Sequence, residues 1–330
     1  MIVSRTPLRI SFVGGGSDFP SFYKQSTKGY GAVISTTINK YIYITVNKKF
    51  DEKIRASYSI TETVDRVSDL KQELIRESLK TVGINRAIEI TSIADVPSGG
   101  TGLGSSSAYT VGVLNALYAF KGKFCSAEKL AQEAYIAEAE KAGKPAGKQD
   151  HYISAYGGLN YIQFNSDGTV FVEPIIMKEK TKRNIERSLL LLYTGTTRNS
   201  SKILKEQNNG FEDSKKKREI MYRMVEITLQ MKKVLNNSQT DRFGDLLHEN
   251  WMLKAKLVKG ITDFRIDNWY RIARKNGALG GKICGAGGGG FLLLYAPRSK
   301  HRKIVSALPR LKPFDFSFEP QGSRIIFAGT

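Results

Sequence analysis

Hydrophobic and polar positions alternate with two different periods along this chain of 330 residues, and together they predict an α+β protein. Residues 33–46 and 88–93 are rich in β-branched and aromatic side chains, which is typical of strands. Residues 69–82 and 108–120 instead repeat their apolar positions at helical spacing. Further helices are predicted at 126–142, 214–234, 241–258 and 266–276, and further strands at 1–7, 157–164, 188–193, 291–295 and 324–328.

A basic stretch without glycine, residues 177–187, precedes the apolar strand at 188–193. We take this stretch as the boundary between two domains, residues 1–176 and 177–330. The chain is long for a single core and long enough for two. Its hydrophobic (41%) and charged (25%) fractions are those of an ordinary globular protein, so disordered and fibrous classes are excluded.

The net charge of +20 has two interpretations, a nucleic-acid partner or a small polyanionic substrate. No RNA-recognition or helix-turn-helix signature accompanies the basic residues, and the run at 215–218 opens an amphipathic helix whose charged face suits solvent. We therefore expect no nucleic-acid partner. No apolar run is long enough to cross a bilayer, and the N-terminus lacks a signal-peptide pattern, so we expect no membrane partner. Two distant cysteines, Cys125 and Cys284, predict neither a disulfide framework nor a thiolate metal site, which favours the cytoplasm.

A glycine- and serine-rich segment, residues 95–108, joins the strand at 88–93 to the helix at 108–120. Backbone N–H groups converge at such a junction beside the positive end of a helix dipole, so the segment predicts a phosphate cradle; a flexible turn is the alternative. It fits neither the Walker A loop nor the dinucleotide fingerprint, because Gly104 precedes serine and the spacing is G-G-x-G-x-G. The expected phosphate-binding residues are Pro97, Ser98, Gly99, Gly100, Thr101, Gly102, Leu103, Gly104, Ser105, Ser106 and Ser107.

Two carboxylates in the same half are candidates for chemistry. Glu138 shares one side of the helix at 126–142 with Ala127, Ala131 and Ala134, whereas Glu140 falls on the opposite side. A carboxylate on that small-residue face is either a Mg²⁺ ligand or a buried ion-pair partner. Asp150 lies in the glycine-rich loop that follows, where an aspartate is catalytic or a turn residue.

The N-terminal strand also carries polar residues in unusual places. Arg9 lies within an apolar run, which is costly for a permanent charge unless it is paired. The strand then breaks at three glycines, residues 14–16, and Asp18 follows them. A hydroxylated ligand could approach the backbone there, although Asp18 could equally be a cap.

These segments resemble the three motifs of the GHMP kinases, the superfamily of galactokinase, homoserine kinase, mevalonate kinase and phosphomevalonate kinase. The motifs fall near residues 7–19, 95–108 and 282–290, in the family's order. The central Pro-x-x-x-Gly-Leu-Gly-Ser-Ser pattern has one extra residue between Pro97 and Gly102. The resemblance spans essentially the whole chain. It implies a ribosomal-protein-S5-like N-terminal domain, a ferredoxin-like C-terminal domain and an active site in the cleft between them.

The resemblance also implies roles for single residues. ATP and Mg²⁺ are the implied cofactors, with the cradle holding the nucleotide phosphates and Ser106 and Glu138 holding the metal. Asp150 corresponds to the catalytic aspartate, and Arg9 to the basic residue beside it. The run from Cys284 to Gly290 corresponds to the third motif, with Gly287 and Gly288 expected next to the substrate.

Galactokinases read Gly-Glu-His-x-Asp-Tyr where this chain reads Gly-Gly-Gly-Ser-Asp-Phe at 14–19, so a different sugar is expected. The combined motifs resemble the bacterial D-glycero-D-manno-heptose 7-phosphate kinases most, and next the kinase domain of L-fucokinases. This implies transfer of the ATP γ-phosphoryl group to the anomeric hydroxyl of heptose 7-phosphate, giving the 1,7-bisphosphate for capsule or related surface polysaccharide. The expected substrate contacts are Gly15, Gly16, Ser17 and Asp18, with Arg198 and Lys202 for the 7-phosphate unless these two are ordinary surface charges.

Two other function classes stay open at this point. A non-catalytic sugar or nucleotide sensor of the same fold would lack Ser106, Glu138 or Asp150, and all three are present. An RNA-binding protein is suggested by the charge and by the similarity of the family's fold to ribosomal-protein-like domains. The exact sugar, the residues that contact adenine and the oligomeric state, a homodimer included, are not fixed by the sequence.

Overall fold

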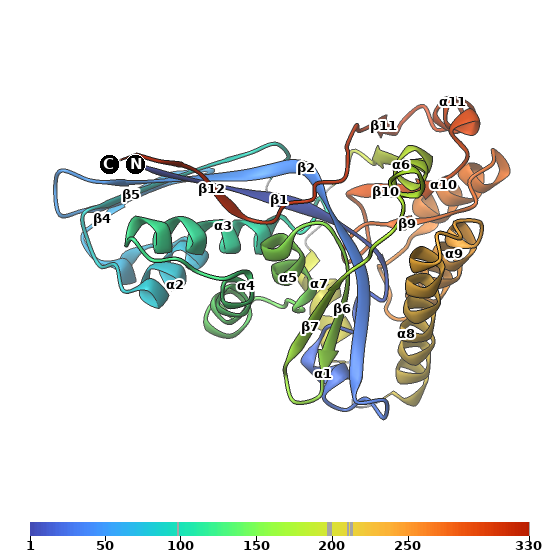
Figure 1. Cartoon of the computed structure of the whole chain (residues 1–330), viewed down its shortest axis with the longest axis horizontal. Coiled ribbons are helices and arrows are strands. Elements are labelled where there is room, and N and C mark those ends of the chain that lie inside the picture. The colour runs from blue at the N-terminus through green and yellow to red at the C-terminus, as the bar shows by residue number, and fades with distance from the viewer. Residues whose placement is uncertain (98, 197–199, 210, 212–213, 330) are drawn as a thin grey trace.

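The computed structural model describes residues 1–97, 99–196, 200–209, 211 and 214–329, and two sheets organise this part of the chain (Figure 1). The larger sheet has the order β12-β1-β2-β5-β3-β4, and β6 and β7 extend it from β2. Its strands are β1 (Ile2–Val13), β2 (Tyr30–Lys48), β3 (Ile54–Ser57), β4 (Thr61–Val64), β5 (Ile88–Ala94), β6 (Leu159–Asn165), β7 (Val170–Pro174) and β12 (Arg324–Ala328). The smaller sheet is antiparallel in the order β11-β8-β10-β9. Its strands are β8 (Leu189–Tyr193), β9 (Gly280–Ile283), β10 (Phe291–Tyr295) and β11 (Lys312–Pro313).

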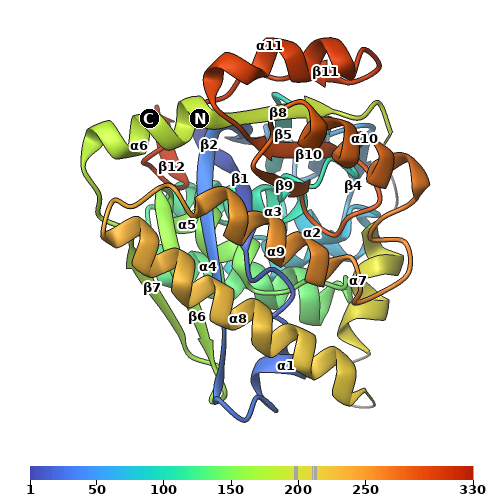
Figure 2. The same cartoon turned by 90° about the vertical axis from the view of Figure 1, so that its right-hand side faces the viewer.

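Helices cover the large sheet on one face and surround the smaller sheet on the other side of the molecule. Figure 1 places α2 to α5 beneath the large sheet, and Figure 2 shows α8 and α9 crossing in front of β1 and β2. None of the helices in the described ranges is long and apolar enough to cross a membrane. The helices are α1 (Pro20–Tyr23), α2 (Glu73–Val82), α3 (Ser105–Phe120), α4 (Ala127–Tyr135), α5 (Gln149–Tyr156), α6 (Glu179–Ser188), α7 (Ser200–Asn208), α8 (Lys215–Asn236), α9 (Phe243–Lys254), α10 (Phe264–Lys275) and α11 (Arg298–Ala307), with 3₁₀ turn η1 at Val67–Asp69 and π-helical turn η2 at Ile136–Lys141.

Strand β2 belongs to both arms of the large sheet. Its residues 42–48 pair with β5 and its residues 30–36 pair with β6, while β1 runs antiparallel to both parts. The β1–β2 register shifts twice, between Pro7 and Leu8 and again between Ser11 and Val13. Such irregularities bend a strand and re-aim its side chains, and Arg9 lies between the two shifts.

Helix α3 is apolar on nearly every side, as a helix inside a core must be. It packs against β1 and β2 on one side and against α2 and α5 on the others. Gly112 lets α3 approach β1 closely, because a Cβ there would lie 2.8 Å from Thr6 Oγ1. The packing fixes the start of α3, at Ser105, beside Arg9.

Several predicted elements differ from the structure. The helix predicted at 69–82 begins only at Glu73, because the Gln72 side chain accepts hydrogen bonds from the N–H groups of Leu74 and Ile75 and so caps it. The helix predicted at 126–142 changes into the π-helical turn η2 after Tyr135. The stretch at 177–187 is mostly helix α6, which sequence reasoning missed because Ile185 is its single buried residue.

The placement of Asp150 in a loop was also wrong. Asp150 lies in the first turn of α5, a helix that the glycines before it conceal in the sequence. Both cysteines are free and buried, as expected. The last strand, β12, returns to pair with β1, and the division into residues 1–176 and 177–330 stays a prediction.

Candidate active site

A cavity of about 610 Å³ contains most of the residues singled out in the sequence. Its lining comes from β1, the loop before α3, the start of α5, one side of α7, the end of α9, and the loop between β9 and β10. Segments from both halves of the chain therefore meet around one hollow. Its volume falls within the range of small-molecule sites in proteins.

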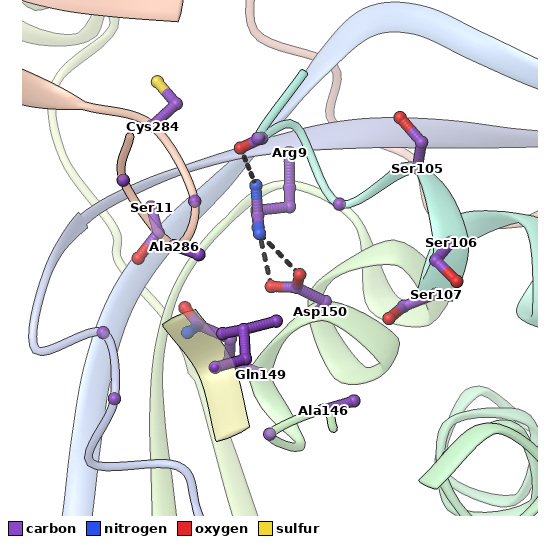
Figure 3. Close-up of a pocket in the computed structure, with 18 of the residues that line it drawn as sticks. Arg9, Ser11, Ser105, Ser106, Ser107, Ala146, Gln149, Asp150, Cys284 and Ala286 are labelled. Carbon is purple, nitrogen blue, oxygen red and sulfur yellow. Dashed lines mark hydrogen bonds and ion pairs between the residues drawn. The ribbon is translucent and has the colours of Figure 1, made fainter. Parts of the chain in front are cut away.

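Arg9 and Asp150 form a bidentate ion pair in this cavity (Figure 3). Arg9 Nε donates to Asp150 Oδ1 at 2.6 Å, and Nη2 donates to Oδ2 at 2.5 Å. The third nitrogen, Nη1, donates to the carbonyl of Gly102 at 2.6 Å. Arg9 is only 4% exposed, but the Asp150 side chain keeps 21% of its surface accessible. Each nitrogen of the guanidinium thus helps to hold Asp150 or the glycine loop, while the carboxylate still faces the cavity.

The glycine-rich loop presents the N-terminus of α3 to the cavity. Gly104 precedes the helix with φ of 75°, and a Cβ there would press on the Arg9 side chain at 3.0 Å. Gly102, with φ of 77°, abuts the second glycine-rich loop, since a Cβ there would lie 2.4 Å from the Cys284 carbonyl oxygen. The two loops therefore approach each other closely through backbone atoms, beside the N-terminus of α3, whose first N–H groups have no acceptor within the helix.

Glu138 is buried beside the first turn of α3. Its Oε2 lies 2.8 Å from Nε2 of His151, and the hydroxyls of Ser106 and Ser107 also bond its carboxylate. Burial opposes ionisation of Glu138, but the hydrogen bond and charge of His151 and the two serine hydroxyls outweigh it, so the pKa of the carboxyl is lowered. Glu140 is exposed, as the helical-face reasoning required.

These groups fit a magnesium ion in part. No cluster of three histidine, cysteine, aspartate or glutamate side chains occurs in the described ranges. Mg²⁺ needs few protein ligands when phosphate oxygens and waters supply the rest. One ionised carboxylate with a serine hydroxyl close to it, at the N-terminus of α3, is such a donor set.

Asp18 is held at the opposite wall of the cavity. Gly16 N donates to its Oδ1 at 2.9 Å, while Gln149 donates through its backbone N to Oδ2 and through Nε2 to Oδ1. A Cβ on Gly147 would lie 2.0 Å from Oδ2, so glycine is required there for the carboxylate to fit. Burial and the negative charge of Asp150 raise the pKa of Asp18.

Two buried lysines that sequence reasoning missed complete this wall. Lys254, the last residue of α9, donates to the Gly285 carbonyl at 2.9 Å, and Lys282 of β9 donates to the Ser11 carbonyl at 2.6 Å. Burial lowers the pKa of Lys254 to about 8 and that of Lys282 to about 7. A lysine inside the apolar strand that precedes the glycine run was the available signal for Lys282. Lys254 resembles any charged residue at a helix end.

Comparison with known proteins identifies the architecture that holds this cavity. The model of the GHMP kinases N terminal domain matches residues 68–158, and that of the GHMP kinases C terminal domain matches residues 231–312. Mevalonate kinase of Thermococcus onnurineus is 30% identical over 72% of this chain and 67% of its own length. The chain belongs to the GHMP kinase family.

Two further relatives are similar to this GHMP kinase over nearly its whole length. D-glycero-alpha-D-manno-heptose 7-phosphate kinase of Campylobacter jejuni is 29% identical over 97% of both chains. The crystal structure of a D-glycero-D-manno-heptose 1-phosphate kinase from Bacteroides thetaiotaomicron superposes with a TM-score of 0.81 at 24% identity, covering all of both chains. At that identity the superposition shows the fold alone. Kinases of this family take their phosphoryl group from ATP.

Within this GHMP kinase the cavity gathers most, but not all, of the expected residues. From the cradle, Leu103 turns its side chain into the core and uses its carbonyl to accept from Arg9 N, and Pro97 does not line the cavity. Ser17 fastens the loop by bonding the backbone of Ala32. Gly287 lines the cavity, whereas Gly288 does not and donates to the Ile261 carbonyl.

Of the two residues expected at the 7-phosphate, the structure describes only Lys202, and it does not line the central cavity. Arg198 lies outside the described residues, as does Ser98 of the cradle. Lys202 is exposed on α7. It lines two neighbouring hollows but not the central cavity. Lys144 lines both the central cavity and one of those hollows, of about 840 Å³.

Proposed function

We propose that the chain is an ATP-dependent sugar kinase that phosphorylates the anomeric hydroxyl of D-glycero-D-manno-heptose 7-phosphate. The observation that carries the proposal is the Arg9–Asp150 pair, a carboxylate held in one orientation between a phosphate cradle and a polar acceptor wall. The end-to-end similarity to the Campylobacter jejuni heptose kinase supports this acceptor. Gly15 and Gly16 line the cavity at the positions where galactokinases carry Glu and His, which leaves room for a different sugar.

In the proposed reaction the N–H groups of the cradle and the dipole of α3 bind the β- and γ-phosphates. Asp150 orients the anomeric hydroxyl and accepts its proton as the oxygen bonds to the γ-phosphorus. The bond to the bridging oxygen of ADP then breaks, and ADP leaves with that electron pair. Arg9 holds the Asp150 carboxylate in this orientation through two hydrogen bonds, so positioning and electrostatics supply the catalysis.

A magnesium ion would be held by Ser106 and Glu138. When bound, it would neutralise charge on the β- and γ-phosphate oxygens during transfer. The Glu138 carboxylate and the hydroxyls of Ser106 and Ser107 already lie close together, so binding of the ion would need no large rearrangement of these side chains.

The 7-phosphate of the acceptor would extend toward α7. We place it near Lys144, which pairs with Glu73 at 3.6 Å and borders the hollow that Lys202 also lines. Arg198 stays a candidate for the same phosphate. A cationic rim on this side accounts for a preference for a phosphorylated acceptor.

One experiment separates the acceptors. The protein is incubated with Mg-ATP and, in turn, mannose, L-fucose, galactose, heptose 7-phosphate and mevalonate, and phosphorus NMR locates the new phosphate. Turnover of heptose 7-phosphate to the 1,7-bisphosphate is expected. Turnover of an unphosphorylated sugar alone would reject the acceptor but keep the sugar kinase, and nucleotide or sugar binding without turnover would indicate a sensor.

A further inference from the structure

Three polar side chains with unused hydrogen-bonding capacity converge around Gly15. They come from three elements, Ser11 from β1, Gln149 from α5 and Lys254 from α9. The position of a Cβ on Gly15 would lie 3.5 Å from Gln149 Nε2, 3.5 Å from Lys254 Nζ and 3.7 Å from Ser11 Oγ. Ser11 Oγ and Gln149 Oε1 are buried without a hydrogen-bond partner in the described part of the chain. Buried polar atoms are normally paired, so this wall is built for a ligand.

Lys254 is the charged member of the group. It is 4% exposed, and within the described residues its ammonium forms one hydrogen bond, to the neutral Gly285 carbonyl, and no ion pair. An ammonium has three donors, so two are left over at the cavity wall. Burying such a charge with one neutral partner is costly, which agrees with the lowered pKa of Lys254. The residue is therefore poorly explained as a purely structural one.

The groups beside Lys254 indicate which ligand suits it. The carboxylate of Asp18 lies close enough to act on its charge, and Gln149 donates Nε2 to Asp18 while its Oε1 has no partner in the described part of the chain. This wall therefore presents hydrogen-bond acceptors at Asp18 and Gln149 Oε1 next to a hydrogen-bond donor at Lys254 Nζ. Neighbouring hydroxyls of a sugar satisfy such an alternation, whereas a carboxylate on the acceptor would meet Asp18 and Asp150.

We propose that Lys254 is a specificity-determining residue for the acceptor, donating a charged hydrogen bond to a sugar oxygen next to the hydroxyl held by Asp150. This inference rests on the proposed sugar-kinase function. The same ammonium holds Gly285, so the acceptor oxygen and the second glycine-rich loop share one cation. Acceptor binding and the position of that loop are coupled through Lys254.

The test compares Lys254→Met, which keeps the length of the side chain but removes its donors, with Lys256→Met two residues further on. Lys256 is exposed and does not line the cavity. Calorimetry measures the dissociation constant of the acceptor without nucleotide, and steady-state kinetics measure KM for ATP. Lys254→Met should weaken acceptor binding about 10- to 100-fold with little change in KM for ATP, and Lys256→Met should resemble the wild type.

Acceptor analogues lacking one hydroxyl each identify the contact. The analogue that lacks the contacted hydroxyl should bind the wild-type protein as weakly as the parent sugar binds Lys254→Met. The affinity of this analogue for Lys254→Met should be no lower than its affinity for the wild type. Lys254→Gln, which retains a neutral donor, should recover part of the affinity and serves as the variant if Lys254→Met does not fold.

Three results would overturn the assignment. The first is an acceptor affinity in Lys254→Met within about twofold of the wild type. The second is a variant in which only KM for ATP changes. The third is a set of analogues that each lose the same acceptor affinity in the wild type as in Lys254→Met. In each of these cases the proposed sugar kinase stands. Wild-type protein that turns over no sugar would overturn both proposals together.

Discussion

His151 Nε2 donates to Glu138 Oε2 at 2.8 Å, and both side chains are buried. His151 directly follows Asp150 in α5, so this bond ties the carboxylate beside the phosphate cradle to the helix that carries the proposed base. The two carboxylates are thereby fixed relative to each other by one histidine. Three of the four predicted catalytic and metal-binding residues lie on the elements that meet here: Ser106 at the start of α3, Glu138 in η2 and Asp150 in α5.

The first prediction concerns Glu138. Glu138→Gln keeps the size of the side chain but removes its charge, so the apparent activation constant for Mg²⁺ should rise at least about 10-fold. Titration of activity with Mg²⁺, and calorimetry of Mg²⁺ with a non-hydrolysable ATP analogue, measure the effect. Glu140→Gln, exposed two residues away, is the matched control. If both variants respond to Mg²⁺ alike, Glu138 is only the ion-pair partner of His151.

The second prediction concerns Asp150. Asp150→Asn can still accept from Arg9 but cannot take a proton, so kcat should fall by about 10²- to 10⁴-fold while ATP binding is retained. An assay coupled to ADP release gives kcat, and a fluorescent nucleotide gives the dissociation constant. Asp65→Asn, on an exposed aspartate far from the cavity, should be unchanged. Near-normal kcat in Asp150→Asn would refute the assignment of the base.

The third prediction concerns the contact between the two glycine-rich loops. Gly102→Ala places a Cβ 2.4 Å from the Cys284 carbonyl at a positive φ, which should cost about 1–3 kcal/mol of stability and raise KM for ATP. Urea unfolding and kinetics measure the two effects. Gly122→Ala is the control, because Gly122 has a similar φ of 67° but no atom lies within 4 Å of its Cβ and it does not line the cavity. An equal free energy of unfolding and an equal KM for ATP in the two variants would show that close contact between the two glycine-rich loops is not needed.

The fourth prediction concerns pH. Burial, followed by the charge of Lys254, lowers the pKa of Lys282 to about 7, against 10.5 for an ordinary lysine. Between these values the unfolded chain binds more protons than the folded chain, so the contribution of Lys282 to stability is greatest above pH 10.5 and is lost as the pH falls toward 7. In Lys282→Met this dependence disappears.

The Tm of Lys282→Met minus the Tm of the wild type should therefore decrease steadily from pH 7 to about pH 10, because the wild type gains stability over this range. This holds whatever the value of the difference at pH 7. Scanning calorimetry at several pH values measures it. The same difference for Lys275→Met, on an exposed lysine of α10, should stay constant. A constant difference for Lys282→Met as well would mean that the buried lysine keeps its ordinary pKa.

The sequence predicted those parts of the site that depend on local backbone pattern. The cradle before α3 and the burial of Glu138 follow from glycine spacing and helical periodicity, both of which are local. The start of α5 was hidden because the glycines of 143–147 conceal a helix that Arg9 of β1 and Asp18 of the loop after β1 hold in place from far along the chain. Lys254 and Lys282 were missed for the same reason, since only tertiary packing turns an ordinary lysine into a buried one.

Pairing of β12 with β1 has a consequence for the order in which this molecule can assemble. During synthesis β1 emerges before its outer neighbour, Arg324–Ala328, which follows the smaller sheet and the helices of the described ranges in the chain. Until then one edge of β1 exposes unpaired backbone groups, a surface on which nascent chains can add to one another. Completion of the larger sheet therefore waits for β12, and loss of these five residues would reopen its edge.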